Sequence, residues 1–230
     1  FSIDIEGASV DVGQTNSTGT TALTSDAMGS VTAGTMAAGG DILIGAGTGG
    51  FTATTLNADQ AVIIFTEGGA QFTSATGDDL VSVNGDGNVD VTSLNGGNGA
   101  VVDVTGTLVA DIVSAGANGV ADISAAQGIT IGTLSGVVAT LTADNGIVNV
   151  ITDIDVANLV TATGTSVSLN ATGDLQATAD ATIGTVNITV GGNGASIIGG
   201  VNRSAIDTSA GSSADQVTLS GGTIATGFFT

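Results

Sequence analysis

Apolar and small polar residues alternate along most of the chain. Clear examples are Val10-Asp11-Val12, Val81-Ser82-Val83, Val102-Asp103-Val104 and Ile129-Thr130-Ile131. A period of two places every second side chain on the same face, so each segment predicts a short β-strand with one apolar and one polar face. Gly-centred breaks separate the segments, and Asn-Gly, which occurs six times, accepts the left-handed backbone of a sharp corner. The pattern predicts an all-β chain.

The spacing of these segments indicates a repeat. Strand onsets that follow Gly recur at Val101, Val120 and Val138. The pentapeptide Gly-Gly-Asn-Gly-Ala of residues 96–100 returns at 191–195, which is five such steps later. A repeat of about 19 residues predicts a β-solenoid resembling a parallel β-helix, with about 12 rungs over the whole chain. A β-sandwich is the alternative, because sandwiches also separate short strands by frequent turns.

The repeat is less regular near the N-terminus. Residues 1–76 contain Thr-, Gly- and Ala-rich stretches, such as residues 15–21 and 33–40, in which no repeat is evident. We therefore predict an irregular N-terminal β region or cap over residues 1–76 and a repetitive region of β-rungs over residues 77–230. One continuous domain is the alternative.

Charge and composition exclude several classes of function. The chain has 21 acidic residues and one basic residue, Arg203, for a net charge of −20, and it lacks Lys, His, Cys, Trp, Tyr and Pro. Without His, Cys, Lys or Tyr, acid–base and nucleophilic chemistry would depend on Asp, Glu, Ser and Thr, so we predict that the protein is not an enzyme. Nucleic acid is excluded as a partner because phosphates are neutralised by Lys and Arg. The run of large apolar residues at 61–65 is far shorter than the roughly 18 residues of a membrane span.

One segment concentrates oxygen ligands. Asp78, Asp79, Asp86 and Asp90 lie among Gly and Asn residues. Calcium is bound by carboxylate, amide and carbonyl oxygens, and Gly-rich turns bring carbonyls close to the ion. These four residues are therefore candidate ligands of Ca²⁺, which would be the only cofactor. The alternative is that they are solvated Asp residues in turns.

The chain resembles repetitive bacterial surface proteins. Phrases within residues 89–150, such as Val102-Asp103-Val104-Thr105-Gly106, resemble the rungs of filamentous-haemagglutinin-type adhesins. Gly77-Asp78-Asp79-Leu80 resembles half of the calcium-binding nonapeptide of RTX proteins, and the Thr-, Ala-, Gly-, Val- and Asp-rich body is similar to that of RTX-type S-layer proteins. The resemblance implies an exported β protein with a structural or adhesive role.

These observations together predict a function outside the cell. A chain that begins with Phe1 rather than Met suggests that a leader was removed or that the chain was cut from a larger precursor. Repulsion on a surface with a net charge of −20 would be relieved by salt or divalent cations, which favours an extracellular or cell-surface location. We expect a self-assembling subunit of a surface filament, sheath or S-layer. The alternative is the shaft of a secreted adhesin that binds a host cell, a neighbouring cell or another surface.

Assembly is expected to be a head-to-tail homopolymer. Terminal strands with unpaired backbone groups recruit neighbours, and apolar residues lie near both ends of the chain. The candidate assembly residues are Phe1, Ile3, Ile5, Val10, Val12, Phe228 and Phe229. Residues 1–12 either complete a sheet of the next subunit or form the first rung of their own subunit.

Overall fold

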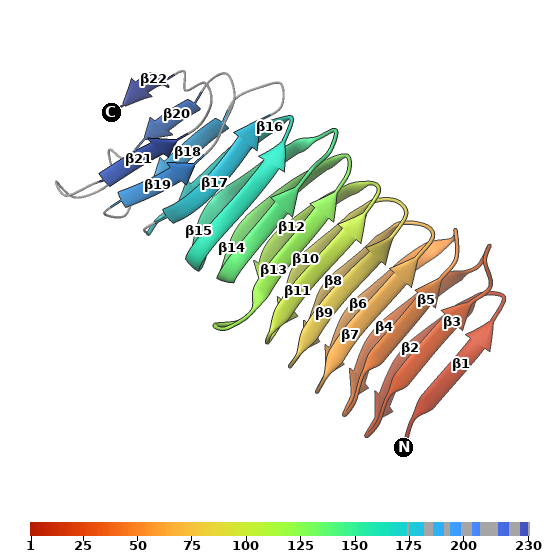
Figure 1. Ribbon diagram of the computed structural model, residues 1–230. Helices are drawn as coiled ribbons and strands as arrows, with labels where there is room; N and C mark the ends of the chain where they lie inside the picture. Colours follow the sequence, from red (N-terminus) through yellow and green to blue (C-terminus); the bar gives the residue numbers. More distant parts are fainter. Residues whose placement is uncertain are drawn as a thin grey trace.

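The computed structural model is an elongated stack of short parallel β-strands, with β1 at one end (Figure 1). It describes residues 1–173, 175–181, 186–190, 194–198, 204–207, 216–220 and 226–229, with side chains up to residue 189 except that of residue 180. Within these ranges the regular structure is entirely β. Among the described residues no helix is long and apolar enough to cross a membrane.

Twenty-two strands make up the stack. They are β1 (Ile3–Gly7), β2 (Val10–Ser17), β3 (Thr21–Ser25), β4 (Ser30–Ala38), β5 (Ile42–Ala46), β6 (Gly50–Ala58), β7 (Ala61–Thr66), β8 (Ala70–Gly77), β9 (Leu80–Gly85), β10 (Val89–Gly96), β11 (Gly99–Val104), β12 (Thr107–Ser114), β13 (Val120–Ala125), β14 (Gly128–Thr142), β15 (Ile147–Gly164), β16 (Ser166–Ala171), β17 (Leu175–Ala181), β18 (Val186–Val190), β19 (Gly194–Ile198), β20 (Ser204–Asp207), β21 (Gln216–Ser220) and β22 (Thr226–Phe229).

The strands form two parallel ladders that alternate along the chain. Up to β13, each strand pairs with the strand two places further on, so odd-numbered strands form one ladder and even-numbered strands the other. The long strands β14 and β15 continue both ladders in turn: β14 pairs with β12 through its first half and with β13 through its second. About ten turns result, slightly fewer than predicted, and β19 to β22 continue the two ladders. The predicted β-solenoid is confirmed, and parallel pairing excludes the antiparallel β-sandwich.

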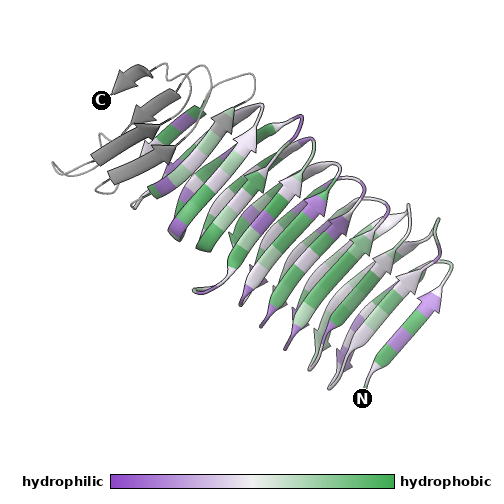
Figure 2. Cartoon of the chain, in the orientation of Figure 1, coloured by the Kyte–Doolittle hydropathy of each residue, from purple (hydrophilic) through white to green (hydrophobic). Residues whose placement is uncertain are grey.

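The core is a narrow stack of aliphatic side chains. Along the odd ladder Ile42 pairs with Val62 and Val62 with Val81, and all three are buried. Phe51 and Phe72, in consecutive turns, have ring centroids 5.9 Å apart. Hydrophobic and hydrophilic bands alternate along the strands in Figure 2. The period-two pattern of the sequence therefore corresponds to an inward and an outward face in every turn.

The even-numbered strands contain a bend. In β6, Phe51 and Ala53 are buried and then Leu56 and Ala58, so alternation skips a position after Ala53. The same skip occurs in β4, β8 and β10. In the first half of the stack, each turn is therefore one straight odd strand followed by a bent even strand, and both halves of the bent strand face the core.

The predicted step between turns holds in the middle of the stack. Phe51, Ala70, Val89 and Leu108 occupy successive positions of the even ladder, and their spacing along the chain is constant and equal to the predicted repeat. The next step, from Leu108 to Ile129, is two residues longer. The repeat is thus approximate, as expected.

Two of the spacings that suggested the repeat do not join paired positions of a ladder. Val101 pairs with Asp122 rather than with Val120, because the chain from β11 to β13 is two residues longer than the regular step. Across later turns, the ladder position of Ala100 reaches Ile197 rather than Ala195. The two Gly-Gly-Asn-Gly-Ala copies are therefore offset by two residues and mark no shared position.

The ladders continue through the N-terminal region without a break. β6 pairs with β8 and β8 with β10, so the pairing crosses residue 77 in register. The strands of residues 1–76 thus belong to the same two ladders as the strands that follow. The repeat is hidden in the stretch 15–21 because Thr15, Ser17 and Thr21 occupy buried, inward positions, where the alternating pattern has apolar residues.

Candidate functional site

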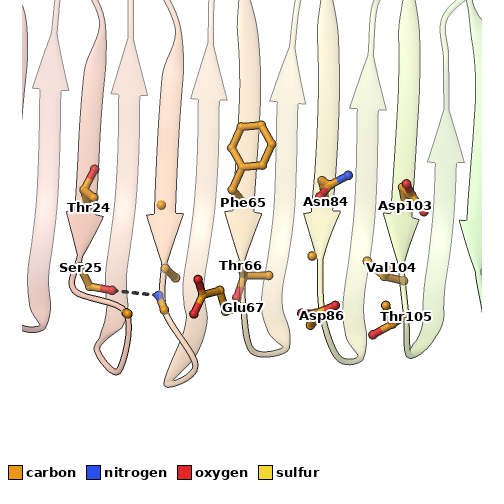
Figure 3. Close-up of a pocket in the computed structure, with 15 residues that line it drawn as sticks. Thr24, Ser25, Phe65, Thr66, Glu67, Asn84, Asp86, Asp103, Val104 and Thr105 are labelled. Carbon is orange, nitrogen blue, oxygen red and sulfur yellow. Dashed lines mark hydrogen bonds between the residues drawn. The ribbon is translucent and has the colours of Figure 1, made fainter.

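A groove runs across five turns of the solenoid, at the point where each odd-numbered strand ends and the loop after it begins. It has a volume of about 570 Å³ and lies at the ends of β3, β5, β7, β9 and β11. One row of its lining is a single ladder position, occupied by Thr24, Gly45, Phe65, Asn84 and Asp103 in successive turns. Figure 3 shows Phe65, Asn84 and Asp103 on neighbouring strands, with the turn residues beside them.

Phe65 dominates this row. Its side chain points outward and is 57 % exposed. Its ladder partner in the preceding turn is Gly45, which has no side chain, so a notch lies next to the ring. The groove therefore combines a raised aromatic ring with an adjacent recess.

The second row of the groove is acidic. Glu67, Asp86 and Thr105 lie in the turns that follow β7, β9 and β11. Ionised carboxylates only accept hydrogen bonds, and no basic side chain lies among the residues that line the groove. The groove can therefore accept hydrogen bonds from a neutral or cationic group, and its lining has no cationic side chain to stabilise an anion.

The predicted calcium ligands are not gathered in one place. Asp78 and Asp79 lie in the turn before β9, whereas Asp86 lies in the turn after it. Six strand residues separate them, a length of about 20 Å. Asp90 points outward from β10 and is exposed. Within the part of the chain that the structure describes, no group of three acidic side chains is arranged to hold a metal ion.

The acidic residues instead stack along the solenoid. Asp59 and Asp78 directly follow the ladder partners Ala58 and Gly77, so their carboxylates lie one turn apart. Asp79 accepts a hydrogen bond of 2.8 Å from the Asn98 side-chain amide of the next turn. Asp59 and Asp78 thus form one pair of carboxylates in neighbouring turns, an arrangement that oxygen-binding cations or salt would favour.

Residues 1–12 form the first turn of their own chain. β1 pairs with β3 and β2 with β4. Val10 is buried, whereas Ile3, Ile5 and Val12 are only partly buried. Phe1 is 84 % exposed, and its amino group donates a hydrogen bond to Oγ1 of Thr18. Of the two alternatives for this segment, the chain adopts the first rung of its own subunit.

The candidate assembly residues Phe228 and Phe229 lie in β22. Their side chains are outside the described residues, so they play no part in the site described here.

An outward apolar face was missed from the sequence. Leu43, Ile63, Phe65 and Val101 project from the outer side of the odd ladder. A signal existed in residues 61–65, which are apolar at every position and so break the alternation. Such a run places apolar side chains on both faces of a strand.

Comparison with protein-family models, curated proteins and solved structures gave no match for this chain.

Proposed function

We propose that the protein is a non-enzymatic structural protein of the cell exterior, whose copies stack head to tail into a surface filament, sheath or S-layer. The observation that carries this proposal is the repeated turn, which offers a parallel backbone edge and a row of core side chains to the turn beside it. The first described turn, β1 with β2, presents the same edge and the same core positions that the following turns bury.

The backbone edge supports stacking. β1 pairs only with β3 and β2 only with β4, so the outer N–H and C=O groups of both strands have no strand partner within the described chain. Open edges of this kind recruit another strand. Because both strands would pair in parallel, one added turn satisfies both edges at once.

The exposed end of the core also supports stacking. Ile3 and Ile5 are partly buried, yet Ile42 and Ile44 at the same ladder positions two turns later are almost completely buried. A further turn would bury the first pair as fully as the second. Each buried apolar side chain contributes about 1.5–3 kcal/mol relative to an exposed one.

Proline at the outer edge tests the proposal. Ile3 donates its N–H to the Thr20 carbonyl at 2.9 Å, toward β3. N–H groups alternate between the two edges of a strand, so the Asp4 N–H faces the open edge. Asp4→Pro therefore removes a donor that only a stacked copy would use, and edge strands tolerate proline there. We expect folded protein by circular dichroism that no longer forms polymers in negative-stain micrographs.

Asp4→Asn is the matched control, because it removes the same charge and keeps the N–H. We expect it to polymerise at least as well as the wild type. Polymers of Asp4→Pro as long as those of the wild type would refute stacking through this edge. Wild-type protein without polymers would refute the proposed function.

The shaft of a secreted adhesin is the second candidate. The outward apolar face and the groove beside Phe65 favour it, because an exposed apolar patch is typical of a binding surface. An adhesin shaft would remain as single rods in the same micrographs and would bind to cells. Regular polymers distinguish the structural subunit from it.

A further inference from the structure

We propose that two copies of the chain pair side by side, face to face, through the outer surfaces of β5 and β7. In this pairing Phe65 of each copy occupies the notch at Gly45 of the other. This lateral contact is separate from head-to-tail stacking, and it involves a different surface of the solenoid.

The surface is apolar and uncharged at its centre. Leu43 and Gly45 are the outward residues of β5, and Ile63 and Phe65 are the corresponding residues of β7. Leu43 is 37 % exposed and Phe65 is 57 % exposed. Carboxylates lie only at the ends of these two strands: Asp41, at their start, accepts a hydrogen bond from the Ala61 N–H at 3.1 Å, and Glu67 lies in the turn after β7. The central surface is therefore open to an apolar partner.

The ladder register makes this surface complementary to itself. Leu43 pairs with Ile63, and Gly45 pairs with Phe65. A two-fold axis parallel to the strands, midway between β5 and β7, places β5 of one copy opposite β7 of the other. Phe65 then faces Gly45 of the second copy, and Leu43 faces its Ile63. Such an isologous contact makes every interaction twice.

Charge opposes the approach of two copies, because each carries a net charge of −20, so the pairing must rest on the apolar centre of the face. A basic protein would be attracted to the turns that hold Glu67 and Asp86, whereas the central surface offers it no carboxylate. In the proposed pair, Glu6 on β1 of one copy faces Asp103 on β11 of the other, about 12 Å from the axis. These like charges lie at the rim, where salt screens them. Pairing should therefore strengthen as salt concentration rises.

The contact is small. It spans the outward residues of a few strands, well below the roughly 800 Å² per partner of a standard interface. A single pair is consequently weak, but repetition along two stacked filaments would multiply its strength. The contact would join filaments laterally into ribbons or layers.

The test compares four proteins by sedimentation velocity at rising concentration and at low and high salt, all in the Asp4→Pro background that removes head-to-tail stacking, so that wild type here means unchanged at every other position. We expect the wild type to form dimers that tighten with salt. Phe65→Asp should raise the dimer dissociation constant about tenfold or more, because it places a carboxylate in the apolar contact. Ile112→Asp, at a position on the even ladder that is 44 % exposed, is the matched control and should leave the constant unchanged.

The Gly45→Val variant distinguishes specific pairing from nonspecific hydrophobic association. A Cβ at Gly45 would meet the Thr24 side chain at 3.4 Å, an ordinary contact, and Gly45 does not have a positive φ, so the fold should accept valine. Valine fills the notch while adding apolar surface. We expect weaker pairing, whereas nonspecific association would become stronger.

Three results would overturn the proposal. The wild type could stay monomeric at high salt, Phe65→Asp and Ile112→Asp could raise the dimer dissociation constant equally, or Gly45→Val could associate more strongly than the wild type. The first result would indicate that a protein of another sequence binds this face. In micrographs the two proposals fail differently. Polymers of single width would contradict lateral pairing alone, and short paired rods would contradict head-to-tail stacking alone.

Discussion

At the scale of single residues, the inward or outward direction of a side chain decides its contribution to stability. Ile131 on β14 is completely buried, whereas Ile112 on β12 is 44 % exposed. The two residues have the same side chain and lie in neighbouring turns of one ladder. They therefore form a matched pair in which only the direction differs.

Alanine at these two positions should have unequal effects. Ile131→Ala leaves a cavity between the turns above and below, and we expect it to lower the free energy of unfolding by about 3 kcal/mol. Ile112→Ala should cost less than about 1 kcal/mol, because its side chain is half exposed. Urea denaturation followed by circular dichroism measures both, and similar losses would contradict the assigned inward and outward faces.

At the scale of strands and turns, the tight spacing of the ladders limits which residues fit at the bends. Gly34 lies at the bend of β4, and a Cβ there would come within 2.0 Å of the Gly13 carbonyl oxygen of the preceding turn. Gly13 occupies the corresponding position of β2, and a Cβ there would have no neighbour within 4 Å. Both glycines belong to one ladder position, but only Gly34 has a turn beneath it.

Gly34→Ala should therefore destabilise the first turns, and Gly13→Ala should not. We expect Gly34→Ala to lower the free energy of unfolding by about 2 kcal/mol, because the backbone must shift to admit the methyl group. Gly13→Ala should change it by less than about 0.5 kcal/mol. Thermal denaturation of dilute, unpolymerised protein makes the comparison, and a loss in Gly13→Ala equal to that in Gly34→Ala would show that the close approach is not the cause.

The strands also show which faces the alternating pattern of the sequence predicts and which it does not. It predicted the inward faces of β2, β9 and β11 through Val10, Val81 and Val102, all of which are buried. It did not predict the face formed by Leu43, Ile63 and Phe65, because Leu43 comes from β5 and the other two residues from β7. A pattern along one strand states which residues share a face, but only the pairing register states which strands lie side by side.

At the scale of the whole molecule, the charge distribution is the dominant feature. A net charge of −20 is spread over turns and outward faces, and stacking brings carboxylates such as Asp59 and Asp78 one turn apart. Like charges in this arrangement repel, and the repulsion is reduced by salt and by bound cations. The solenoid should therefore be more stable in a saline or calcium-rich medium.

Calcium is proposed to stabilise the fold through such stacked pairs. We expect calcium chloride to raise Tm by more than an equal ionic strength of sodium chloride, because ligands that bind only the folded chain stabilise it. Asp78→Asn should reduce the calcium-dependent rise. Differential scanning calorimetry with and without chelator measures both effects. Equal curves in calcium and sodium at matched ionic strength would exclude a specific calcium site.

The sequence by itself determined the all-β class, the approximate repeat and the acidic net charge, and it favoured a parallel stack over a β-sandwich. These follow from local properties, because alternation, Gly-centred corners and charge are encoded within each turn. The tertiary structure decided which residues of different turns meet. It separated Asp78 from Asp86 by the length of β9, offset the two Gly-Gly-Asn-Gly-Ala copies, and placed Phe65 next to Gly45. The physical reason is that the length of each turn varies by one or two residues, and these differences accumulate along the stack until only the pairing itself defines the neighbours.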